Sequence, residues 1–103
     1  MPDFSNLMKQ AARMEQDMKR VQAELSTRTV EATSGGGAVK VTARCDGTVA
    51  AIKIDPAAVS AGDVAMLEDL VLSAVSQALN NARDLAAAEM GKVTQGLNLP
   101  GLR

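Results

Sequence analysis

The residues best suited to chemistry are basic side chains on an N-terminal stretch with the pattern of a helix. In LMKQAARMEQDMKRVQAEL, residues 7–25, Lys9, Arg13 and Arg20 recur at steps of four and seven, and Lys19 precedes the last of them. Such steps place side chains on one side of a helix. From Lys9 to Arg20 the row covers about 16 Å at about 1.5 Å per residue. A row of cations of that length can reach several phosphates of a nucleic acid.

A second row on the same stretch is apolar and forms a seam. The apolar seam consists of Leu7, Ala11, Met14, Met18, Val21 and Leu25. Its mean spacing of about 3.5 residues keeps one side of a helix facing a partner helix. On a helical wheel the basic row takes outer positions, while Glu15 and Asp17 lie beside the seam. We therefore predict a helix that Ser5 caps and that runs to about Ser26. Solvation of the basic row, with local pairs such as Glu15 to Lys19, stays open as the alternative to phosphate binding.

The composition argues against an enzyme. The 103 residues include no His, the side chain that most often acts as a general base near neutral pH. Glu68 and Asp69 are adjacent on an expected helix and diverge, so they make a poor acid–base pair. A lone Cys45 allows neither an intrachain disulfide nor a multi-cysteine metal site. We expect no catalysis, no cofactor, no metal and no small-molecule substrate.

Composition and charge also bound the partners. The chain is 47% hydrophobic and 22% charged, typical of one soluble domain, but Phe4 is its single aromatic residue. A small aliphatic core stabilises weakly, which favours oligomerisation. No basic start precedes an apolar run, and no apolar stretch reaches about 18 residues, so we expect a cytoplasmic protein without a membrane partner. Eight of the eleven Lys and Arg residues lie in residues 1–54, where any anion-binding surface is expected.

After Arg28 the apolar spacing changes to two, which indicates strands. Asp46-Gly47 lies between two alternating segments and predicts a two-residue type I′ turn in which Cys45 pairs with Thr48. In that register the facing pairs are Val39 with Ile54, Lys40 with Lys53, and Val41 with Ile52. One face of the sheet is then aliphatic, and the other is basic.

The basic face of the sheet carries Lys40, Lys53 and Arg44. Like charges opposite one another destabilise a strand pair slightly. A neighbouring acid such as Glu31, a phosphate or plain solvation could each compensate for that cost. The sheet is thus a second, less certain candidate for anion binding.

The remaining sequence predicts a second long helix and a tail. Ser60 and Asp63 resemble a capping box, followed by a broad apolar stripe to about Met90 that can cover the sheet. Glycine and proline then favour an irregular tail. We expect one α+β domain over residues 1–103, with a projecting helix (1–26), a three-stranded antiparallel sheet and long C-terminal helix (27–90), and a tail (91–103). The first helix has no evident place against this sheet, which a second copy would provide.

Four segments in this order resemble the YbaB/EbfC family of bacterial nucleoid-associated proteins. They are NLMKQA at 6–11, VKVTA at 39–43 closing on IDP at 54–56, MLEDLV at 66–71, and GLNLPG at 96–101. The resemblance implies a nucleoid-associated homodimer whose N-terminal helices project like the arms of tweezers and which binds double-stranded DNA with little sequence preference. The acidic residues of the first helix and a pI of about 5.3 depart from the more basic relatives.

The sequence alone therefore yields a set of candidate DNA contacts and one rival function. The candidate DNA contacts are Lys9, Arg13, Lys19, Arg20, Arg28, Lys40, Arg44 and Lys53. Contacts of this kind act on phosphates, because the chain has only one aromatic residue, too few for base stacking, and lacks a zinc-finger ligand set. In the rival function the Met-rich seam grips a protein partner, and DNA binding is weak or absent.

Overall fold

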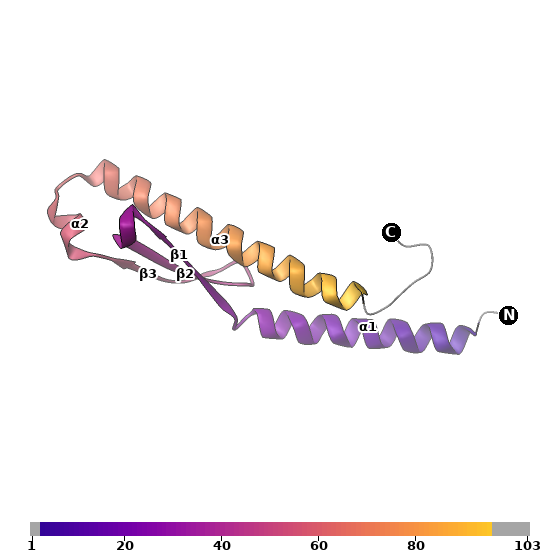
Figure 1. Ribbon diagram of the computed structural model, residues 1–103. Coiled ribbons are helices and arrows are strands. Elements are labelled where there is room, and N and C mark those ends of the chain that lie inside the picture. The colour runs from indigo at the N-terminus through magenta and orange to yellow at the C-terminus, as the bar shows by residue number, and fades with distance from the viewer. Residues whose placement is uncertain (1–2, 96–103) are drawn as a thin grey trace.

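The computed structural model describes residues 3–95. Its elements are α1 (Phe4–Leu25), β1 (Thr29–Ser34), the 3-10 turn η1 (Gly35–Gly37), β2 (Val39–Arg44), β3 (Val49–Ile54), α2 (Pro56–Ser60) and α3 (Val64–Gln95). The three strands form one antiparallel sheet in the order β1-β2-β3. The predicted α+β order of helix, three strands and long helix is confirmed, and α2 is a short addition (Figure 1).

Helix α3 is the longest element, and both the sheet and α1 pack against it. Its 32 residues extend about 48 Å, and the molecule measures 72 × 24 × 16 Å. The sheet packs along its first half and α1 along its second half (Figure 1). Residues 91–95, which the sequence assigns to the tail, are helical, and residues 96–103 lie outside the described residues. One internal glycine costs a helix only about 1 kcal/mol, and Met90 and Val93 on either side of Gly91 pack against the core.

Helix α1 projects less than its sequence suggests. It begins after Asp3, whose carboxylate accepts a 3.4 Å hydrogen bond from the Asn6 amide, so Asp3 replaces the expected Ser5 as the cap. At its C-terminal end Val21 and Leu25 are buried in the core. Because α3 is longer than predicted, it covers this part of α1, and only the N-terminal turns extend past its end (Figure 1).

The segment between β3 and α3 corrects another prediction. Ser60 belongs to α2, where its hydroxyl donates to the Pro56 carbonyl at 2.9 Å, so it does not cap the long helix. Asp63 takes that role by accepting a 3.0 Å hydrogen bond from the Met66 amide. The proline after Asp55 starts α2 because its fixed φ suits a first helical position.

The hairpin between β2 and β3 has a three-residue loop, and the predicted two-residue turn is wrong. Arg44 and Thr48 close the loop through a 2.7 Å backbone hydrogen bond, and Gly47 takes the positive φ of 92° that a G1 bulge requires. Cys45 instead donates its backbone N–H to the Arg28 carbonyl at 2.9 Å. An irregularity opposite Thr42 and Ala43 then restores the predicted register. The pairs Val39 with Ile54, Lys40 with Lys53, and Val41 with Ile52 are confirmed.

The core lies between α3 and the first two strands. Val39, Val41 and Ala43 of β2 are fully buried, and α3 faces them with Ala74, Ala78 and Ala82, also fully buried. Small side chains at every fourth position let the helix lie close to the sheet. The Ser34 hydroxyl, at the end of β1, donates a 2.6 Å hydrogen bond to the Leu70 carbonyl and so joins the sheet to the N-terminal part of α3.

Strand β3 makes almost no contact with α3. Its inward-facing Ile52 and Ile54 are 45% and 38% exposed, although they pair with fully buried residues of β2. The expectation that the second helix covers the aliphatic face of all three strands is therefore wrong. One helix is about 10 Å wide and spans only two strands at about 4.8 Å spacing.

Candidate nucleic-acid interface

Among residues 3–95, no helix covers the face of the sheet opposite α3, and this face presents the predicted cations Lys40, Arg44 and Lys53 (Figure 1). Lys40 lies opposite Lys53, as the register predicts. The Lys40 ammonium pairs with the Glu31 carboxylate of β1 at 3.2 Å, one of the three compensations considered for this face. Lys53 has no carboxylate within 4 Å among residues 3–95. On this face Lys53 is therefore the cation more available to an external anion.

Arg44 is half-buried at the hairpin end of the same face. One of its guanidinium nitrogens lies 3.4 Å from the Thr48 hydroxyl. That hydroxyl donates to the Asp46 carboxylate at 2.6 Å, which lowers the pKa of Asp46, with a smaller effect from the charge of Arg44. Asp46 is thus ionised at neutral pH and weakens the positive potential at the hairpin tip.

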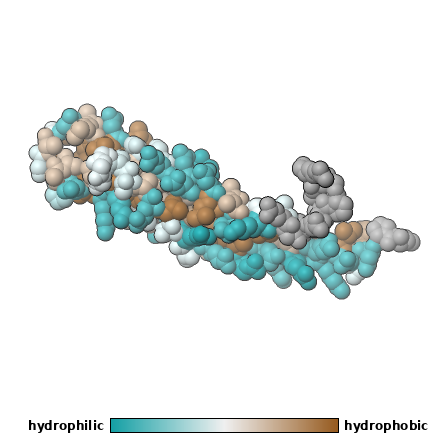
Figure 2. Space-filling view, viewed as in Figure 1, coloured by the Kyte–Doolittle hydropathy of each residue, from teal (hydrophilic) through white to brown (hydrophobic). Residues whose placement is uncertain are grey.

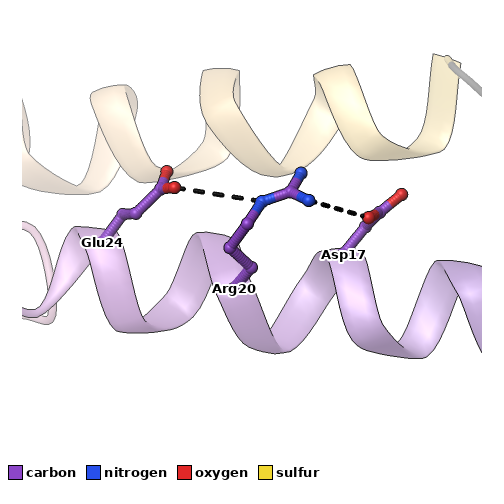
Figure 3. A network of polar contacts seen from close by, with 3 residues as sticks. All are labelled: Asp17, Arg20 and Glu24. Atoms are coloured by element: carbon purple, nitrogen blue, oxygen red, sulfur yellow. Dashed lines mark hydrogen bonds and ion pairs between the residues drawn. The ribbon is translucent and has the colours of Figure 1, made fainter.

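The predicted basic row on α1 divides into two parts. In the inner part Lys19 pairs with Glu15 at 3.3 Å, and Arg20 bridges Asp17 at 3.1 Å and Glu24 at 3.9 Å (Figure 3). In the outer part, within the described portion of the chain, neither Lys9 nor Arg13 has a carboxylate within 4 Å. The sequence explains this division, because no Asp or Glu occurs between Phe4 and Met14.

The side chain of Arg20 is 63% exposed, but it lies on the side of α1 that faces α3. It rises from α1 on that side together with Asp17 and Glu24 (Figure 3). It lines a groove of about 410 Å³ between the two helices. The groove lining consists of Gln10, Arg13, Met14, Asp17, Arg20, Val21, Glu24, Glu89, Lys92 and Val93. The three carboxylates of this lining pair with Arg20 and Lys92, whereas Arg13 at its N-terminal end has no carboxylate within 4 Å among residues 3–95.

Arg28 is occupied in a contact between distant parts of the chain. Its guanidinium lies 3.2 Å from the Glu89 carboxylate of α3, which also accepts a 3.0 Å hydrogen bond from Lys92. The Lys92 bond is the largest cause of a lowered pKa at Glu89, and the charges of Lys92 and Arg28 add to it. Arg28 therefore ties the start of the sheet to α3, which makes it a weaker phosphate contact than predicted.

The sequence did not single out Arg83, a further cation on α3 beside the hairpin loop. It lines a pocket of about 300 Å³ with Cys45, Asp46 and Gly47, and its nearest polar partner is the Asn80 amide oxygen at 3.4 Å. No spacing signal could have found it, because Asp84 follows at once and the strand pairing that brings the hairpin close is tertiary.

Two broader searches cover residues 3–95 only. No helix there is both long and apolar enough to cross a membrane. No three His, Cys, Asp or Glu side chains there lie close enough together to hold a metal ion. The groups that stand out in this part of the chain are thus cations and apolar side chains.

Comparison with known proteins shows which family the chain belongs to. The profile of the YbaB/EbfC DNA-binding family matches residues 1–97. The chain belongs to this family. It is 51% identical over 100 residues to a nucleoid-associated protein of Thermoanaerobacter sp., covering 97% of this chain and 90% of the relative. It is 49% identical to a nucleoid-associated protein of Pelotomaculum thermopropionicum, covering 97% and 95%. The resemblance noted in the sequence is confirmed.

A crystal structure supports the fold of this YbaB/EbfC chain. An uncharacterized protein from Helicobacter pylori superimposes with a TM-score of 0.68 at 20% identity, covering 94% of this chain and 98% of the other. At that identity the likeness concerns the fold alone. The helix, sheet and long helix therefore form an arrangement that has also been observed experimentally.

This YbaB/EbfC chain also has an uncovered apolar groove of about 440 Å³ beside β3. The groove is lined by Ile54, Val64, Leu67, Glu68, Val71, Leu72 and Val75. Leu72 and Val64 are 65% and 66% exposed. The described part of the chain thus leaves apolar surface exposed to solvent here.

The predicted apolar seam of α1 is covered in a gradient. Val21 and Leu25 are buried, Met14 and Met18 are half-buried, and Ala11 and Leu7 are exposed. Figure 2 shows hydrophobic residues where α1 and α3 meet and again at the N-terminal end of α1, where hydrophilic residues surround them; the opposite end of the molecule, around α2, is mixed. The inner seam thus packs within its own chain, and the outer seam is open.

Proposed function

We propose that this chain acts as a homodimer that binds double-stranded DNA through its phosphates, with low sequence specificity, and thereby organises the bacterial nucleoid. The division of the cations carries the proposal. Lys9 and Arg13 lack carboxylate partners on the outer part of α1, and Lys53 lacks one on the open sheet face, among residues 3–95. Cations left unpaired on exposed surfaces gain the most from phosphate contact.

Low specificity follows from the chemistry of these groups. Lysine and arginine on an outer helix face and a flat sheet reach phosphates, which carry no sequence information. No helix-turn-helix pair for groove readout occurs in residues 3–95. The family name and the nucleoid-associated relatives support DNA as the polyanion. Their names also favour action on the nucleoid, hence in the cytoplasm, without any catalytic step.

The uncovered face of β3 supports the homodimer. A second copy that packs against Ile52, Ile54 and the groove along α3 would bury apolar surface that a monomer leaves in water. A dimer also doubles each cationic patch, so two weak sites on one chain become four on one particle. The gain matters for a chain whose net charge is −1.

The test of DNA binding is a titration of random-sequence duplex DNA across a salt series, with light scattering on the same sample. We expect a dimer whose log association constant falls linearly with the log of the salt concentration. Each phosphate contacted should add about 0.9 to the steepness of that slope. Substituting one random duplex for another should leave affinity nearly unchanged. A dimer that fails to bind even at low salt would contradict the proposal.

The test of the dimer is Leu72→Glu, with Val59→Glu on α2 as the matched control. Both side chains are exposed, at 65% and 58%, so neither change should unfold the protomer. Leu72→Glu buries a charge in the proposed contact and should yield monomers by light scattering. Val59 is not among the residues that line the groove, so Val59→Glu should leave dimers. If each of the two variants remains a dimer, the groove is not the dimer contact.

A further inference from the structure

The N-terminal turns of α1 carry an apolar patch that the rest of the described chain leaves open. We call it the arm tip, formed by Phe4, Leu7, Met8 and Ala11. Phe4, Leu7 and Met8 are 75%, 49% and 63% exposed. Phe4, Leu7 and Ala11 continue the three-and-four spacing of the inner seam, which packs on α3. The spacing that selects a helix partner therefore persists where α3 no longer supplies one (Figure 1).

The arm tip and the unpaired cations lie on different sides of the same helix. At about 100° per residue, Phe4, Leu7, Met8 and Ala11 group on one side, and Lys9 and Arg13 fall on roughly the opposite side. The apolar group includes no charged side chain. Phosphates bound by Lys9 and Arg13 would thus leave the apolar side free for another contact.

We propose that arm tips of neighbouring dimers pack against each other, antiparallel, when both dimers are bound to the same DNA. The proposal rests on the proposed DNA-binding function. Antiparallel pairing places the large Phe4 of one copy opposite the small Ala11 of the other, and Leu7 opposite Met8. This large-with-small match makes the surface complementary to itself, as a two-fold contact requires.

The size of the patch decides when the contact forms. Four side chains over about two helical turns bury far less than the roughly 1,200 Å² of a stable interface, so free dimers should not associate through it. Two dimers on one duplex are held close together, and a high effective concentration lets a weak contact form. Binding of one dimer should then favour binding of the next, which is how a protein coats a duplex in continuous runs.

The test compares two lengths of duplex. The short duplex is trimmed until light scattering gives one dimer per duplex, and the long one holds many. The tip variant is Leu7→Gln with Met8→Gln, and Val59→Gln, which removes an equally exposed apolar side chain on α2, is the control. We expect all three proteins to bind the short duplex alike. On the long duplex, wild type and control should bind a site beside an occupied one roughly tenfold or more tightly, and the tip variant should lose that gain.

The outcomes separate the two proposals. Equal, non-cooperative binding by wild type and tip variant on long DNA would overturn the arm-tip contact and leave DNA binding intact. Absence of wild-type binding to the short duplex would overturn the proposed function, and the tip contact with it. A second readout uses Met8→Cys combined with Cys45→Ala in the presence of an added thiol oxidant such as diamide, which accepts the two electrons; a disulfide between copies should form on the long duplex and not on the short one. Equal crosslinking on both would place the contact within one dimer and so overturn the proposal.

Discussion

The two halves of α1 have the same repeat and opposite surroundings. In the inner half, Val21 and Leu25 are buried against the core, and Lys19 and Arg20 pair with carboxylates of their own helix. In the outer half, Leu7 is exposed, and Lys9 and Arg13 have no carboxylate within 4 Å among residues 3–95. The inner half thus has buried apolar side chains and paired cations within the chain, and the outer half has neither.

This difference shows that a sequence pattern alone does not assign a role. The 3.5-residue spacing is continuous through α1, and what divides it is where α3 ends. Packing against α3 gives the inner half a structural role. The outer half keeps the surface available for a partner, which is why a functional reading applies there.

The largest expected effect concerns the apolar seam, whose residues are buried in the inner half of α1 and exposed in the outer half. Leu25→Ala should lower the free energy of unfolding by about 3 kcal/mol, because it removes a side chain that is only 5% exposed and leaves a cavity. Leu7→Ala should change it by less than about 0.5 kcal/mol, because water already surrounds that side chain. Urea unfolding of both variants at one protomer concentration measures the difference. Equal losses would mean that the outer seam is covered in solution.

The next effect concerns the basic row and appears in DNA binding. Lys9→Gln with Arg13→Gln should weaken binding to random duplex and lower the salt slope by about 3 to 4 for a dimer, since each phosphate contact contributes about 0.9. Lys19→Gln with Arg20→Gln removes the same charge but only frees paired carboxylates, so its slope should change by less than about 1. Equal slopes would show that charge number governs binding and pairing does not.

Much of the fold was predictable because it depends on local periodicity. The element order and the pairs of Val39 with Ile54 and Val41 with Ile52 are as predicted. The hairpin loop was not, because the Cys45 amide donates to the carbonyl of Arg28, which directly precedes β1. The extent of α3 was also missed, since contacts of Val93 with the core outweigh the glycine before it. Tertiary contacts decided both cases.

The candidate site was predictable only as a set of residues. Pairing of Glu15 with Lys19, and of Glu31 with Lys40, was considered from spacing and register, and both pairs form. The pairing of Arg28 with Glu89 joins residues far apart in the chain, and no local pattern indicates it. Which cations remain available is thus a property of the folded chain.

The smallest expected effect sharpens the comparison at the junction of the inner half with α3. Arg28, in the connection between α1 and β1, and Lys92 on α3 both contact Glu89, whose pKa is lowered chiefly by the Lys92 hydrogen bond. A lowered folded-state pKa means that the carboxylate contributes stability above its unfolded-state value, about 4.5, and loses it as the pH falls through the folded-state pKa. Glu89→Gln should therefore lower the Tm slightly at neutral pH. The difference in Tm from wild type should shrink as the pH falls through the folded-state pKa of Glu89. Thermal unfolding of both proteins across pH measures it, and the sign of the trend is decisive. A difference that grows in acid would mean that Glu89 acts as a neutral hydrogen-bonding group, so that charge does not hold the inner half of α1 to α3.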